Sequence, residues 1–401
     1  MTARRAPPSR PFAWLWRTLS GGAGLKGLTI QIALVVLVIW IGYEFAANAI
    51  AHFAGQGIST GFGFLGNVAG FEVNQSLIAY SRADTYGRVL VVGLLNTLLV
   101  SIVSIIFATV LGFMIGVGRL SPNGLISRLC GLYVELVRNL PLLFQILFWY
   151  LAVLGTLPGP RASLTLPGGI FLNNRGLIVP QPNMLGGFWP FIVALGAGLA
   201  LCLALWIIAR RRLLKTGRVV RIWPYMPLAL LAPLALALIL FGAPLSFTPP
   251  ELKGFNFSGG VKLIPELVAL TIALSTYTAA FISENVRSGL QSVARGQREA
   301  GASLGLHRSQ ILRLIVLPQA MRVILPPLTN QYLNLTKNSS LAVAIGYPDL
   351  FAVFAGTSLT QTGQAIEIIA ITMAIYLALS LITSLAMNIY GWRLNRIYRG
   401  A

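Results

Sequence analysis

Long apolar runs alternate with short polar and basic segments along the whole chain. A helix needs about 20 predominantly apolar residues to cross the hydrocarbon core of a bilayer. Six runs of that length are clean; they are 28–49, 89–118, 185–209, 225–247, 263–283 and 365–391. Two further runs, 132–157 and 318–344, are interrupted by polar residues or proline. The pattern therefore predicts an all-α polytopic membrane protein with about eight transmembrane helices.

The two interrupted runs differ in character. Glu135, Arg138 and Pro141 stand near the start of run 132–157, so we expect its first part to lie along the membrane surface before the chain crosses. Run 28–49 has no small-residue cleavage site close behind it, and we interpret it as a membrane anchor rather than a signal peptide.

Composition supports a membrane protein over other classes. Of the 401 residues, 56% are hydrophobic and 10% are charged, with a net charge of +20. Soluble domains carry about 25% charged residues, and disordered chains carry few large apolar ones. The basic residues are spread thinly between apolar runs, which excludes the dense basic patches of a nucleic-acid-binding protein. Membrane lipid is the surrounding we expect, and no nucleic acid is an expected partner.

The distribution of Lys and Arg predicts the orientation. If the N-terminus is cytoplasmic, 21 of the 30 basic residues fall in cytoplasmic segments and six fall in external loops. Basic residues concentrate in cytoplasmic loops of membrane proteins. Both termini are therefore expected in the cytoplasm.

Runs 185–209 and 225–247 carry almost no polar side chains, so we interpret them as a lipid-facing hairpin inserted into a smaller core. The external loops 50–86 and 157–184 are rich in turn-forming residues and are expected to be ordered without long helices. Gly112 and Gly116 stand four residues apart, a spacing that allows close helix packing.

Two E-x-x-R pairs, Glu135 with Arg138 and Glu284 with Arg287, lie near predicted cytoplasmic ends of spans. A spacing of three places both charges on one helical face. We favour a local ion pair in each case over a gating role.

The longest predicted cytoplasmic segment between spans covers 284–318. Residues 297–304 are compatible with a helix that carries small Ala300, Gly301 and Ala302, and Gly305 is placed to end it. Pro318 is placed to start the next helix. From the residues alone, a helix that docks another protein and a surface amphipathic loop are equally supported.

The motif in this segment resembles a known one. Glu299, Ala300, Gly301, Gly305, Leu317 and Pro318 have the spacing of the EAA loop of bacterial ABC importer permeases, with Gly301 where alanine is usual. The resemblance implies a coupling helix that docks on a cytoplasmic ATPase. Glycine at 301 lowers helix propensity by about 1 kcal/mol relative to alanine.

Other segments resemble the polar amino acid subfamily of these permeases; they are GLLNTLLVS, YVELVRNLPLLFQ and LPQAMRVILPPLTNQYLNLTKNSSLAVAIGYPDL. The likeness covers 89–156 and 264–390, and the additional spans resemble the Q-type permeases of general L-amino acid importers. It implies a five-helix core in a bacterial inner membrane, a second homologous permease, an ATPase that acts as a dimer, and a periplasmic amino acid-binding protein.

The resulting organisation has six parts. They are a cytoplasmic tail (1–27), an additional span with an external loop (28–88), a first core part (89–157), external loops with the inserted hairpin (158–262), a second core part (263–391) and a cytoplasmic tail (392–401).

Run 318–344 is the candidate for a translocation pathway. Asn330, Asn334 and Lys337 share one helical face, and polar residues inside a membrane usually face a bundle interior or a pathway. Pro326 and Pro327 predict a kink or break that frees backbone carbonyls. We add Ser339 and Ser340 to this candidate set. The alternative is a polar stripe that only binds neighbouring helices.

Two other functions were weighed. An ion-coupled secondary transporter of amino acids or other small polar solutes predicts ionisable relays and similar halves, and neither pattern is found. An enzyme needs a nucleophile with a base, paired carboxylates or metal ligands. His52 and His307 fall on opposite sides of the membrane in this topology, and there is no GxxxxGK[ST] motif. We expect a non-catalytic subunit without cofactor or metal.

Overall fold

The computed structural model describes residues 24–55, 61–184, 188–216, 222, 224–241, 245–254 and 256–399. Within these ranges, five helices are long and apolar enough to cross a membrane, and a bent helix pair would make a sixth. Two apolar helices are shorter by the same criterion, at Thr29–Phe45 and Tyr225–Leu240. The coarse prediction of a polytopic helical membrane protein is confirmed.

The central contact of the fold is between helices α3 (Tyr86–Gly118) and α8 (Pro265–Gln291). A Cβ atom on Gly112 would lie 2.6 Å from Ile282 Cβ, and one on Gly116 would lie 2.8 Å from Val286 Cβ. The two glycines therefore let the helix backbones approach, as the spacing predicts. Helix α8 also packs on α11 (Leu317–Asn338), which packs on α13 (Ala365–Arg399).

The run predicted at 132–157 is bent. Helix α4 (Gly124–Asn139) meets α5 (Leu142–Leu147) and the π-helical segment η2 (Phe148–Leu154) at an angle of 107°. Pro141 stands at the bend, since proline disfavours a helical conformation in the residue before it.

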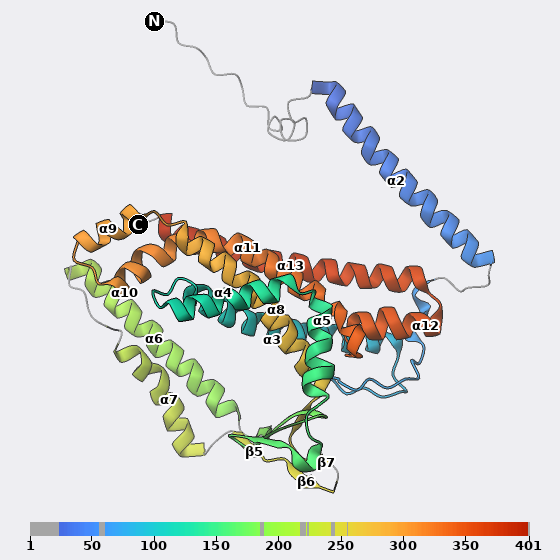
Figure 1. Ribbon diagram of the computed structural model, residues 1–401, viewed down its shortest axis with the longest axis horizontal. Helices are drawn as coiled ribbons and strands as arrows, with labels where there is room; N and C mark the ends of the chain where they lie inside the picture. Colours follow the sequence, from blue (N-terminus) through green and yellow to red (C-terminus); the bar gives the residue numbers. More distant parts are fainter. Residues whose placement is uncertain are drawn as a thin grey trace, which may run out of the picture.

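Helices α6 (Phe188–Thr216) and α7 (Tyr225–Phe241) pack on each other and form a separate pair at the lower left of Figure 1. A small cluster of Phe191, Ala194 and Ala237 is their own core. The predicted span 225–247 is too long at its end, because strand β5 (Leu245–Thr248) pairs with β4 (Gln181–Met184) there. Helix α2 (Gly24–Gly55) covers the first predicted span. The basic residues Arg4, Arg5, Arg10 and Arg17 before it lie outside the described residues.

The loops that the sequence predicts to be external contain short strands, which the sequence did not predict. A four-stranded antiparallel sheet has the order β1-β2-β3-β8, and it joins the loop before the hairpin to the segment after it. Its strands are β1 (Leu164–Leu166), β2 (Ile170–Asn173), β3 (Gly176–Val179) and β8 (Val261–Leu263). The remaining small elements are β6 (Glu251–Lys253), β7 (Asn256–Ser258) and the 3-10 turns η1 (Phe62–Gly66) and η3 (Pro160–Ala162).

Helix α9 (Arg295–Ser303) ends at a turn over residues 304–307. Helix α10 (Arg308–Ile311), the π-helical segment η4 (Leu312–Val316) and α11 then follow one another without interruption. Helices α9 and α10 lie at one end of the bundle and α12 (Leu359–Thr362) at the other (Figure 1). After α11 the chain forms the 3-10 segment η5 (Ser339–Ile345) and the π-helical segment η6 (Phe351–Ser358).

The structure confirms one prediction about prolines and excludes part of another. Pro318 is the second residue of α11, and the wider π-helical turn of η4 just before it accommodates the missing N–H. Of the kink or break expected at Pro326 and Pro327, the break is excluded, because α11 continues through both prolines. Membrane helices tolerate prolines where neighbouring groups satisfy the freed carbonyls.

Candidate functional site

Helix α9 presents most of its residues outward. Glu299 and Ala300 are exposed, and Gly305 follows the helix with φ +75°, a backbone conformation that glycine adopts without strain. The expected helix over 297–304 is confirmed, with bounds shifted by one or two residues. Leu304, at the end of the helix, is 80% exposed.

Gly301 faces the opposite way. It is buried, and a Cβ atom there would lie 2.8 Å from Ile315 Cδ1 and 3.1 Å from Ile311 Cγ1. Gly301 therefore joins α9 to the helix that leads into α11, and its small size serves this internal contact rather than an outward docking face. Leu317 is 39% exposed, and Pro318 is half-buried beside it.

Helix α11 carries an exposed polar face. Asn330, Asn334 and Lys337 are all exposed, in line with Pro326 one turn earlier. Ser339 lies apart from this face, since it is fully buried and its hydroxyl donates to the Thr336 carbonyl at 2.7 Å. Ser340 donates to the Lys337 carbonyl at 2.8 Å. The structure thus brings three of the five candidate pathway residues to one surface.

A cluster of charges joins the ends of three helices. Glu284 on α8 accepts hydrogen bonds from Arg287 on the same helix and from Arg119 after α3, and Arg138 on α4 lies 3.9 Å from it. The predicted pair of Glu284 with Arg287 is confirmed. The second predicted pair is wrong, because within the described residues Arg138 ion-pairs with Glu284 and lies over the Phe281 ring, at 5.1 Å. The cluster connects α3, α4 and α8 by one carboxylate.

Residues 346–350 enter the bundle beside α3, which sequence reasoning missed. The Tyr347 hydroxyl donates to the Asn96 carbonyl at 3.0 Å, and the Leu350 N–H donates to Thr97 Oγ1 at 3.0 Å. Asp349 is fully buried and accepts from the Ala352 N–H at 2.9 Å. A lone acid after a proline, inside an apolar run, is the signal that could have marked this turn.

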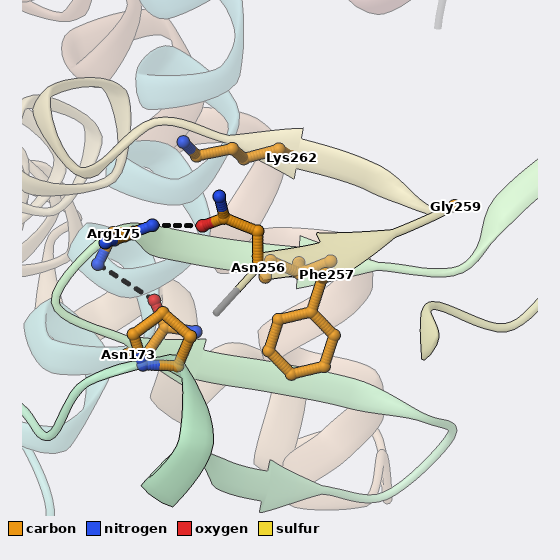
Figure 2. A pocket seen from close by; sticks show the side chains of 8 residues that line it. Asn173, Arg175, Asn256, Phe257, Gly259 and Lys262 are labelled. Atoms are coloured by element: carbon orange, nitrogen blue, oxygen red, sulfur yellow. Dashed lines mark hydrogen bonds between the residues drawn. The ribbon is translucent and has the colours of Figure 1, made fainter. Parts of the chain in front are cut away.

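The four-stranded sheet and β7 border a small polar pocket of about 300 Å³ (Figure 2). Arg175 donates to Asn256 through its guanidinium and to Asn173 Oδ1 through its backbone N–H, at 2.8 Å for the latter. Lys262 and Phe257 also line the pocket. It offers hydrogen-bond donors and positive charge at the surface. Across the described part of the chain, His, Cys, Asp and Glu form no group of three that could hold a metal ion.

Comparison with known proteins identifies the class. Residues 210–396 match the family described as the binding-protein-dependent transport system inner membrane component. The chain is 51% identical over 375 residues to the putative amino-acid ABC transporter permease protein YhdX of Escherichia coli, covering 94% of this chain and 95% of the relative. It is 46% identical over 397 residues to the general L-amino acid transport system permease protein AapQ of Rhizobium johnstonii, covering 98% of each.

The chain belongs to the permeases of polar amino acid ABC transporters. It is a non-catalytic, multi-pass component of the inner membrane, and its class works with an ATPase and a binding protein. Membership of this family excludes the two alternative functions, an ion-coupled secondary transporter and an enzyme. Among solved structures, an amino acid ABC transporter with histidines aligns with a TM-score of 0.46 and 20% identity, covering 77% of this chain and 95% of that one.

Proposed function

We propose that this permease moves L-amino acids into the bacterial cytoplasm after a periplasmic binding protein delivers them, and that α9 receives the ATPase. The outward face of α9 carries this proposal, with Glu299, Ala300 and Leu304 exposed at one end of the bundle. Its likeness to permeases with amino-acid transport in their names supports the substrate class.

We infer an orientation with both termini in the cytoplasm and eight spans, counting α2, the bent α4–η2 pair and the two hairpin helices. The distribution of Lys and Arg supports it. In this arrangement the core comprises 89–157 and 263–391, with the coupling segment at 284–318. The parts outside this core are 1–27, 28–88, 158–262 and 392–401. The contacts of α6 with α7, and their own small cluster, support an inserted hairpin.

The path for substrate is proposed along the exposed face of α11. Asn330, Asn334 and Lys337 would be costly against lipid, so a second, homologous permease facing them would bury and use them. Lys337 offers an ammonium group to a substrate carboxylate. Ser339 and Ser340 would act from behind this face, at the turn that ends α11.

Coupling follows from the continuity of the chain. Closure of two ATPase subunits would displace α9, and the contact of Gly301 with Ile315 would pass that displacement to the helix that continues as α11. Gly305, Leu317 and Pro318 shape the turn and the π-helical segment between them. The segment from Gly305 to Pro318 thus connects the proposed docking helix α9 mechanically to the polar face of α11.

Co-purification tests the proposal. The chain should be expressed with its genomic neighbours, purified by a tag on the permease, and reconstituted with the binding protein. An ATPase and a second permease should purify with it, and L-amino acids should stimulate ATP hydrolysis. Absence of an ATPase, or hydrolysis that no amino acid stimulates, would refute it.

A further inference from the structure

An apolar groove lies beside α9, the proposed docking helix. It has a volume of about 1130 Å³ and is lined by the ends of α3 and α8, the start of α4, and the helix from α10 into α11. Met114, Val117 and Leu312 are among its walls, and each stays at least 48% exposed. The groove is thus an apolar surface that the described residues leave uncovered.

Two arginines stand at the groove. Arg298 is on α9 and Arg308 begins α10, and both line the cavity. One Arg298 nitrogen donates to the Leu290 carbonyl at 2.7 Å, which fixes its guanidinium there. Neither arginine has an acidic partner within 4.0 Å among the described residues. An amphiphile with an anionic headgroup would complement this site, because its headgroup would meet the arginines and its hydrocarbon chain would fill the apolar groove.

The length of the groove is close to the hydrocarbon thickness of one bilayer leaflet. Its wall runs along the helix from Arg308 to Ile324, and at 1.5 Å per residue the apolar part from Leu312 to Ile324 spans about 18 Å. Half of a hydrocarbon core of about 30 Å is about 15 Å. The groove therefore extends from headgroup depth toward the bilayer centre.

We propose that an anionic phospholipid of the cytoplasmic leaflet binds in this groove, with its phosphate at Arg298 and Arg308 and an acyl chain along the walls. Basic pockets between membrane helices on the cytoplasmic side bind anionic headgroups. The assignment to the cytoplasmic leaflet rests on the orientation proposed above. The choice of an anionic phospholipid rests on the apolar lining of the groove and its two arginines. Because Arg298 is on α9, the lipid would hold the docking helix to the membrane surface and make its position sensitive to lipid charge.

Lipid retention tests this site. The assembled transporter should be purified in neutral detergent, given vesicle lipid of phosphatidylcholine with phosphatidylglycerol, and analysed by native mass spectrometry. Wild type should retain phosphatidylglycerol. Arg308→Gln should lower retention about fivefold, the effect of one arginine near an anionic lipid. Arg313→Gln is the matched control, since this exposed arginine is outside the groove lining.

A second pair of variants tests whether filling the groove displaces the lipid. Met114→Trp fills it, whereas Val110→Trp places the same ring one turn away on α3, at an exposed site outside the lining. Only Met114→Trp should reduce retention. Equal retention in all variants, equal loss in Arg313→Gln and Arg308→Gln, or a protein segment seen in the groove would each overturn the proposal. Lipid retention is measured separately from transport. A complex that retains the lipid but imports no amino acid would therefore refute the proposed function and leave the lipid site supported.

Discussion

Gly301 and Ile315 are in such close contact that a Cβ atom at position 301 would lie 2.8 Å from Ile315 Cδ1. This contact joins the helix proposed to receive the ATPase to the helix that carries the polar face. The atom met is the far end of a flexible side chain, so a methyl group can be accommodated where a larger group cannot. The contact therefore sets a size limit at position 301.

Gly301→Leu is expected to separate α9 from Ile315 and to reduce amino-acid uptake at least about fivefold, the factor that corresponds to the lower end of the roughly 1–3 kcal/mol that overpacking costs. Gly301→Ala should retain uptake, because alanine restores about 1 kcal/mol of helix propensity. Uptake of radiolabelled amino acid by cells with equal permease levels measures both. Similar uptake by the leucine and alanine variants would exclude the size limit.

Glu284→Gln is expected to destabilise the permease. It removes the carboxylate shared by Arg119, Arg138 and Arg287 and leaves three cations near one another. Because the Glu284 side chain is 27% exposed, we expect a loss of about 1–2 kcal/mol, less than for a fully buried pair. Thermal unfolding in detergent measures it.

Glu135→Gln is the control for this change. Glu135 is exposed and lines one pocket together with Glu284 and its three arginines, but within the described residues it has no ion pair. Its variant should unfold at the wild-type temperature. An equal shift in both variants would indicate that net charge, rather than the cluster, stabilises these helix ends.

Gly112→Val is expected to disrupt the contact of α3 with α8, since the added Cβ would meet Ile282 at 2.6 Å. Overpacking of this kind costs about 1–3 kcal/mol. Gly131→Val provides the comparison, because the space around Gly131 on α4 is open. The yield of monodisperse permease in size-exclusion chromatography should fall for Gly112→Val and not for Gly131→Val.

Lys337→Met is expected to impair uptake while leaving assembly with the ATPase intact, because the exposed ammonium group faces away from this chain's own core. Lys253→Met removes a positive charge from strand β6, far along the chain from α11, and should leave uptake unchanged. Pull-down and uptake are measured on the same cells. Wild-type uptake by Lys337→Met would remove Lys337 from the pathway.

The sequence predicted the helical membrane fold well because apolar length and basic flanks are local properties. The contact of Gly112 with α8 and the end of α9 at Gly305 were also predictable, since each depends on a glycine whose spacing or position is informative. The motif around Glu299 placed the docking helix to within two residues.

Long-range contacts were not predictable from one sequence. Glu284 has Arg287 three residues away, but its bond to Arg119 spans 165 residues. The Tyr347 contact with Asn96 spans 251 residues. Whether Gly301 faces inward also depends on how the chain turns at Gly305. Helical periodicity does not specify the direction of that turn. The sheet that joins β3 to β8 pairs strands from either side of the hairpin, and such short strands have little signal of their own.

The central claim is that the exposed face of α9 transmits ATP hydrolysis to transport. Glu299→Trp changes that face, and Glu251→Trp makes the same replacement on strand β6. The most direct measurement is amino-acid-stimulated ATP hydrolysis by the purified complex in proteoliposomes. We predict that Glu299→Trp loses the stimulation, with or without loss of the bound ATPase, while Glu251→Trp retains it. Full stimulation in the Glu299→Trp complex would contradict the account.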